Sequence, residues 1–138
     1  MPATELENLH RIGKLKVELS SVREIKGLLD SARARLVDAG NEALSFASRF
    51  DLGYNAAHGL ALCALRNTGY RSENRYLVFQ CLPHTTGLSV EVWRVLAKAH
   101  ERRNLSEYEG HLEIDDRLLA NMLAAAAALL ETVELTCN

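Results

Sequence analysis

The sequence predicts an all-α protein, an up-and-down bundle of four to five helices in one domain covering residues 1–138. Three observations support this fold class. Apolar residues recur every three or four positions along most of the chain. Residues that begin and end helices stand between these periodic segments. No run of residues alternates as a half-buried strand would. A chain of this length can bury a core without metals or disulfides.

The N-terminal part shows two capping boxes, each marking the start of a helix. The first pairs Thr4 with Glu7 and predicts a short helix. The second pairs Ser21 with Glu24 and predicts a longer one. Gly40 follows the apolar periodicity of the second helix, so we expect that helix to end there.

A third helix is expected over about residues 42–68. Its alanines and Gly59 are small enough to let a partner helix pack closely. Tyr54 falls at core spacing, and Asn55 and His58 beside it leave open the alternative of a pocket. The apolar stripe consists of Phe46, Phe50, Tyr54, Ala57, Ala61, Leu62 and Leu65.

Three further helices complete the prediction. Residues 73–82 have some strand propensity but no strand partner in the chain, so we interpret them as a short helix stopped by Pro83. Ser89 is a plausible cap for a helix over 89–108. The last helix is expected over about 115–135, with aspartates in its first turn, where the helix dipole favours them.

Composition narrows the class of protein. The chain is 48% hydrophobic and 25% charged, as in soluble globules, and its net charge of -2 argues against simple coating of nucleic acid. Its three cysteines are far apart, which fits reduced thiols, with Cys63 and Cys81 as buried fillers. The N-terminus lacks a signal-peptide pattern, and the longest apolar run is short. The histidines show no metal-ligand spacing. We therefore expect a cytoplasmic protein with no metal, no other cofactor and no membrane association.

The helix over 89–108 carries polar side chains where its buried face should continue. Its apolar direction is set by Val92, Trp93, Leu96 and Ala97. Continuing by threes and fours reaches His100, Arg103, Asn104 and Glu107. Polar groups on a buried face need partners, so this end should meet a second subunit, a ligand or a hydrogen-bond network. Glu107 can also simply pair with Arg103 at i,i+4 spacing.

The other side of the same helix is basic. Arg94, Lys98 and Arg102 repeat every four residues and form a ridge. Such a ridge is either a solvated face or a surface that holds phosphates. Arg102 is expected to point away from the core, although it is adjacent to Arg103.

Several segments together resemble the HEPN domain, a small helical module of prokaryotic toxins, defence proteins and partners of minimal nucleotidyltransferases. The similarity covers nearly the whole chain. It rests on "IGKLK", "RFDLGYNAAHGLALCALRNTGYR", "YLVFQCL" and "RRNLSEYEG", in that order and spacing. The resemblance implies a homodimer in which the last long helices and the arginine motif face one another. It also implies RNA as a ligand, since many members are metal-independent ribonucleases.

The family motif is an arginine, a polar residue, and a histidine four to six residues further on. The resemblance places the arginine at Arg103 and the polar residue at Asn104. The histidine window covers residues 108–110, which are Tyr-Glu-Gly. Cleavage through the RNA 2′-hydroxyl needs a group that takes a proton near neutral pH, and tyrosine is a poor base there. His111, just beyond the window, and His100, one turn before Arg103, are the candidates that remain.

Three functional hypotheses stay open. The first is a ribonuclease toxin with a dimer cleft formed by Arg103, Asn104, Tyr108 and His111. In that hypothesis the basic ridge holds phosphates. The second is a non-catalytic HEPN module in which the polar cluster, with His100 and Glu107, holds a dimer together or binds RNA, a nucleotide or a protein partner. The third is a plain structural helical dimer. A nucleotidyltransferase-type antitoxin is the partner that the resemblance suggests.

Overall fold

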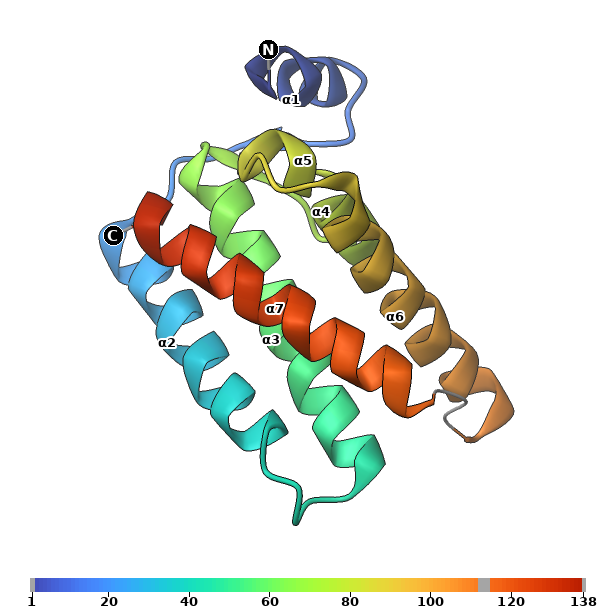
Figure 1. The fold of residues 1–138 in the computed structure, drawn as a ribbon. Coiled ribbons are helices and arrows are strands. Elements are labelled where there is room, and N and C mark those ends of the chain that lie inside the picture. The colour runs from blue at the N-terminus through green and yellow to red at the C-terminus, as the bar shows by residue number, and fades with distance from the viewer. Residues whose placement is uncertain (1, 112–114, 138) are drawn as a thin grey trace.

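The computed structural model describes residues 2–111 and 115–137, and its four long helices form an up-and-down bundle (Figure 1). Successive long helices run in opposite directions. Their bounds are α2 Val22–Ala39, α3 Phe46–Asn67, α6 Val90–Glu109 and α7 Asp116–Cys137. Three shorter helices cover one end: α1 Pro2–Arg11, α4 Arg75–Gln80 and α5 Leu82–Thr85. The predicted all-α class is confirmed.

Side-chain caps explain why most of these helices begin where they do. The Ser21 hydroxyl accepts the Glu24 N–H at 3.1 Å, as the second capping box predicts. Ser45 accepts the Ser48 N–H at 3.2 Å, so α3 starts later than the sequence suggested. Other caps are Asn74 before α4 and Asp115 before α7. Ser89 precedes α6 but makes no side-chain cap bond.

Two predicted helix boundaries are wrong, one start and one end. Thr4 lies inside α1 rather than at its cap, because the helix already begins at Pro2. Pro83 does not stop a helix either. It occupies the first turn of α5, where the missing N–H of proline costs nothing, and α4 has already ended at Gln80.

The close approach of two helices occurs at Gly53, not at Gly59. A Cβ at Gly53 would lie 2.7 Å from Leu123 Cδ2 and 2.8 Å from Met122 Cε, both on α7. A Cβ at Gly59 would meet nothing within 4 Å. The sequence therefore correctly predicted tight packing of the third helix but named the wrong glycine.

A short antiparallel ribbon, absent from the sequence prediction, ties the N-terminal segment to the bundle. Strand β1 Lys16–Val17 pairs with β2 Tyr70–Arg71. Two residues per strand are too few to produce a readable alternation of apolar and polar positions. The ribbon brings Glu18 next to the C-terminal end of α3.

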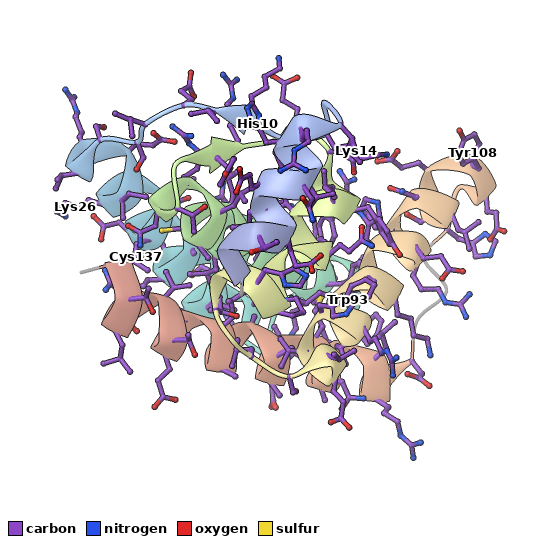
Figure 2. The ribbon with its side chains drawn as sticks, turned by 90° about the horizontal axis from the view of Figure 1, so that it is seen from above. His10, Lys14, Lys26, Trp93, Tyr108 and Cys137 are labelled. Atoms are coloured by element: carbon purple, nitrogen blue, oxygen red, sulfur yellow. The ribbon has the colours of Figure 1, made fainter. Side chains whose placement is uncertain are left out.

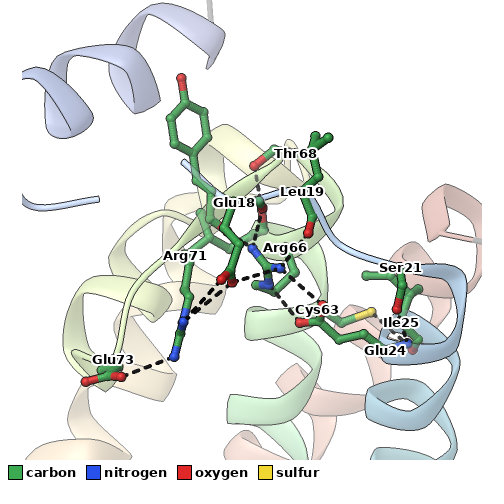
Figure 3. A network of polar contacts seen from close by, with 12 residues as sticks. Glu18, Leu19, Ser21, Glu24, Ile25, Cys63, Arg66, Thr68, Arg71 and Glu73 are labelled. Carbon is green, nitrogen blue, oxygen red and sulfur yellow. Dashed lines mark hydrogen bonds and ion pairs between the residues drawn. The ribbon is translucent and has the colours of Figure 1, made fainter. Parts of the chain in front are cut away.

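Arg66 is the centre of the polar network that holds this ribbon (Figure 3). Its side chain is only 3% exposed. Nε and Nη2 donate to the two Glu24 oxygens at 2.7 and 3.1 Å, and Nη1 donates to the Glu18 and Tyr70 carbonyls at 2.6 and 3.2 Å. The Glu24 carboxylate raises the Arg66 pKa, and the Arg66 hydrogen bond lowers that of Glu24. The network therefore has a structural role that the sequence did not reveal.

The core lies between the four long helices and under α4 and α5. Its largest fully buried side chains are Tyr54, Phe79, Leu15, Leu60, Leu65, Leu82, Leu96, Met122 and Leu129. The expectation that Cys63 and Cys81 are buried fillers is confirmed. Burial raises the pKa of Cys63 to about 12 and that of Cys81 to about 11, so both stay protonated at neutral pH.

Within the described residues, α7 is long and apolar enough to cross a membrane by length and composition. The longest uninterrupted apolar run in the sequence is shorter than α7, because isolated polar residues interrupt it. These residues barely lower the mean hydropathy of the whole helix. In the structure α7 packs on α2, α3 and α6, and Met122, Ala126, Leu129 and Val133 are fully buried. A core helix satisfies the same criterion, so it carries no membrane assignment.

Candidate functional site

The polar residues near the C-terminal end of α6 divide into a half-buried and an exposed group. His100 and Arg103 are half-buried, and the Arg103 side chain is 29% exposed. Asn104 and Glu107 are exposed. The buried stripe therefore ends about one turn earlier than predicted. The expected i,i+4 ion pair is present, with 3.5 Å between Arg103 Nη2 and Glu107 Oε1.

The buried face of α6 is also rotated slightly from the predicted direction. Leu96 and Ala99 are fully buried, whereas Trp93 and Ala97 are only partly so. Arg102, which was expected to point away from the core, is half-buried, as Arg103 is. Of the predicted basic ridge, Arg94 and Lys98 are exposed.

A chain of hydrogen bonds links the core to the surface through His100. Tyr54, fully buried on α3, places its hydroxyl 2.8 Å from His100 Nδ1. Asn104 Nδ2 lies 3.0 Å from His100 Nε2. With the amide in this orientation, Asn104 donates to Nε2, so a neutral ring carries its proton on Nδ1 and donates to the Tyr54 oxygen. Both ring nitrogens are thus engaged within the protein.

Two arginines from different helices lie over the Tyr54 ring. The Arg103 guanidinium carbon is 5.0 Å from the ring centroid, and that of Arg75, on α4, is 5.6 Å away. Arg75 also donates from Nη1 to Asn55 Oδ1 at 3.1 Å. Cations over an aromatic face are attracted by the ring quadrupole. Tyr54 is therefore both the expected core residue and the platform for two cations.

The surroundings of the two nearby histidines favour their neutral forms. Burial lowers the pKa of His58 to about 4, and the positive charges of Arg75 and Arg103 contribute. Burial also lowers the pKa of His100, helped by Arg103 and then Arg75. Two desolvated histidines beside two arginines mark a region of positive potential.

An open cavity of about 630 Å³ lies against α6 and α4. Its walls combine aromatic and aliphatic groups with cations and an amide. The lining residues are Tyr76, Arg94, Ala97, Lys98, His100, Glu101, Asn104, Leu105 and Tyr108. The structure thus brings five of the residues singled out from the sequence to one cavity, and adds Tyr76, which stands 6.0 Å from His100 between ring centroids.

The two remaining catalytic candidates lie at the end of α6. Tyr108 is 90% exposed, and Figure 2 shows it pointing away from the bundle. Gly110 ends the helix in the left-handed conformation at φ 79°, which confirms the expected C-cap. Just beyond it, His111 is exposed and its Nδ1 lies 3.2 Å from the Glu109 carbonyl oxygen.

This arrangement is better suited to holding a ligand than to taking a proton. His100 is neutral at pH 7, but both of its nitrogens are engaged, and releasing Nε2 requires Asn104 to move. Arg103, by contrast, pairs with one exposed carboxylate among residues 2–111 and 115–137 and retains donors for an anion.

Sequence reasoning missed two members of the site. Arg75 and Tyr76 both lie on α4, in a segment interpreted only as a short helix. Their contacts with Tyr54 and His100 join positions far apart in the chain, so helical spacing could not reveal them. The one available signal was the adjacent arginine and tyrosine at the start of an otherwise apolar helix.

The comparisons with known proteins found no matching family model, no matching curated protein and no matching solved structure. Among residues 2–111 and 115–137, no three His, Cys, Asp or Glu side chains gather where they could hold a metal ion.

Proposed function

We propose that this protein is a cytoplasmic HEPN-like module that binds single-stranded RNA, in a toxin or defence role. The observation that carries the proposal is the cavity of about 630 Å³, in which aromatic rings, an amide and two cations meet. Unpaired bases stack on aromatic side chains, each worth about 1–3 kcal/mol, while cations hold the backbone. Tyr76 and Tyr108 supply the rings, and Arg94 and Lys98 the cations.

Binding without cleavage is the form of this function that the site supports best. The family motif has tyrosine where a histidine is expected, and His100 is bonded on both sides. If cleavage occurs, His111 or His100 must move the proton and Arg103 must stabilise charge on phosphorus. Such cleavage needs no metal and follows a bell-shaped pH profile.

Incubation of the purified protein with total cellular RNA and a chelator, from pH 5 to 9, separates the two forms. We expect the RNA to stay whole. A fluorescent single-stranded oligonucleotide should nevertheless bind, and Tyr76→Ala should weaken that binding at least tenfold. The matched control is Tyr70→Ala, which changes a tyrosine on the ribbon, away from α6. RNA left intact but unbound would refute the proposal.

Tyr108→His tests whether the site can cleave RNA once a histidine stands at the position where the HEPN motif has one. If the site is an inactive ribonuclease, this variant should gain metal-independent cleavage. If it gains nothing and RNA binding persists, the site is a binding surface only.

The same surface also suits a second copy of the chain. Tyr76, Leu105 and Tyr108 around the cavity are 43%, 38% and 90% exposed. Apolar groups gathered in this way are typical of an interface. A homodimer is therefore part of the proposal, and a nucleotidyltransferase-type antitoxin encoded by a neighbouring gene would strengthen the toxin role.

A further inference from the structure

Arg75 is a half-buried cation whose described contacts include no carboxylate. Its Nη1 donates to the neutral Asn55 amide oxygen, and its guanidinium lies over the Tyr54 ring. Arg66 and Arg33, by contrast, each pair with glutamate, whereas the half-buried Arg49 donates to the Ala39 carbonyl. A partly desolvated charge is costly unless an opposite charge compensates it. Arg75 therefore lacks a counter-charge that an external anion can supply.

Arg103 lies over the same Tyr54 ring as Arg75, and its own counter-charge is weak. Both guanidinium carbons lie over one ring, at 5.6 and 5.0 Å from its centroid. The carboxylate on Arg103 belongs to Glu107, whose side chain is 62% exposed, so the pair is weak. The two guanidinium groups, one from α4 and one from α6, leave most of their N–H donors for a planar or tetrahedral oxyanion.

Two cavities, one aromatic and one polar, are lined by Arg75 or by residues next to the two arginines in the sequence. Tyr76 and Asn104, their neighbours in sequence, line the first cavity. Arg75 itself lines the second, of about 570 Å³, together with His58. That second cavity contains glutamates, but Glu24 is committed to Arg66, and Glu18 and Glu73 pair with Arg71. The positive charge of Arg75 thus has no carboxylate partner among the described residues and that of Arg103 only the exposed Glu107, consistent with the effect of both arginines on His58.

We propose that Arg75 and Arg103 form a two-arginine clamp that binds the phosphates of an RNA strand whose base occupies the aromatic cavity. The identity of the ligand rests on the proposed function. The clamp adds a residue outside the arginine-asparagine motif and assigns α4 a role in binding. Arginine suits this role because its fork matches phosphate oxygens, whereas lysine offers only a point charge.

The first test is the salt dependence of binding to a single-stranded RNA oligonucleotide. Each phosphate contact contributes about 0.7 to the slope of log K against log salt concentration. Arg75→Gln and Arg103→Gln should each lower the slope by about 0.7, and the double variant by about 1.4. Lys26→Gln is the matched control, since it removes one positive charge from α2, far from α6 (Figure 2).

Arg75→Lys separates a clamp from a merely structural arginine. It keeps the charge but loses the fork, so the slope should stay near that of the wild type while the affinity falls. Circular dichroism and thermal melting of each variant show whether it is folded. If Arg75→Gln does not fold, Arg75→Lys carries the test through its affinity. An unchanged affinity and slope in the folded variants would refute the clamp while leaving RNA binding intact.

The second test uses tripolyphosphate, so that the clamp and the proposed function can fail separately. At matched ionic strength, tripolyphosphate should raise the melting temperature of the wild type above that in chloride. The increase should disappear in Arg75→Gln and persist in Lys26→Gln. Stabilisation through Arg75 without RNA binding would support the clamp and overturn the RNA proposal. No stabilisation together with no effect of Arg75 on RNA binding would refute the clamp.

Discussion

Two arginines that look alike in the sequence have different surroundings in the structure. Arg66 is 3% exposed and donates to two carboxylate oxygens and three backbone carbonyls. Arg103 is 29% exposed and has one weak carboxylate partner. The first has every donor direction occupied and maintains the fold. The second has donors left over, which is what a binding residue requires.

Arg66→Ala should therefore be among the most destabilising single substitutions in this chain. It leaves Glu24 and several carbonyls without their donor, and breaking a buried ion pair typically costs about 3–5 kcal/mol. Arg71→Ala is the matched control on the same ribbon. Its side chain is 43% exposed, so we expect a loss within about 1 kcal/mol. Urea unfolding followed by circular dichroism measures both, and equal losses would contradict the structural role of Arg66.

The hydroxyl of Tyr54 should contribute more to stability than that of Tyr76. Tyr54→Phe keeps the buried ring but removes the hydrogen bond to His100, which should cost about 1 kcal/mol. Tyr76 is 43% exposed, so Tyr76→Phe should change stability by less than about 0.5 kcal/mol. Thermal unfolding measures the midpoints of both variants. Equal midpoints would mean that Tyr54 is not the hydrogen-bond partner of His100.

At the residue scale, the sequence predicted what helical spacing can reveal. The direction of α6 placed His100 and Arg103 towards the core side, and the structure shows both half-buried. It could not reveal Arg75, because the Tyr54 ring that joins Arg75 to Arg103 comes from a third helix. Contacts between distant parts of the chain depend on packing, which periodicity does not encode.

At the element scale, α3 shows how a helix can be predicted well and yet be placed inaccurately. Its apolar stripe was recognised, and Tyr54, Ala57 and Ala61 are fully buried. Its start was missed because several polar residues precede it and the deciding one is Ser45, whose hydroxyl caps the Ser48 N–H. Capping depends on one side-chain bond, so helix ends are harder to predict than helix centres.

The two glycines of α3 should respond to substitution in opposite directions. Gly59→Ala should stabilise by about 0.5–1 kcal/mol, because its Cβ meets nothing within 4 Å and alanine favours helix. Gly53→Val should destabilise by about 1–3 kcal/mol, since its Cβ would stand 2.7 Å from Leu123 Cδ2 and force α7 to shift. Denaturant midpoints that moved in the same direction would show that α3 and α7 are not in close contact.

At the scale of the whole molecule, stability should depend on pH through His58. Its pKa is lowered from 6.5 to about 4 in the folded protein, chiefly by burial. Below pH 6.5 the unfolded chain takes up a proton that the folded one does not, so stability falls between pH 6.5 and 4. The loss should be on the order of 1–2 kcal/mol, given the partial exposure of the ring.

His58→Gln isolates this effect from the carboxylates that also titrate in acid. The difference in unfolding free energy between the wild type and His58→Gln should be constant above pH 7 and should decrease from pH 6.5 to 4. A difference that stayed constant through this range would mean that His58 has an ordinary pKa in the folded protein.

The exposed end of α6 leads to the prediction that concerns the whole assembly. A single chain leaves Tyr108 90% exposed and Leu105 38% exposed beside an open cavity, on the helix that carries Arg103. A stable dimer buries about 800 Å² per partner, and such a patch is where that burial is most favourable. Light scattering at micromolar concentration should therefore give twice the 15.3 kDa mass of one chain.

Charged substitutions should dissociate the dimer only if the substituted residues lie in its interface. The double variant Leu105→Glu and Tyr108→Glu places like charges on a self-facing surface, so we expect the mass of a monomer with an unchanged helical spectrum. Leu135→Glu is the control, because Leu135 is 82% exposed at the opposite end of α7. If the wild type is a monomer, the α6 patch must be covered by a ligand or by another protein. If Leu135→Glu alone separates the subunits, the dimer forms through the end of α7 and not through the α6 patch.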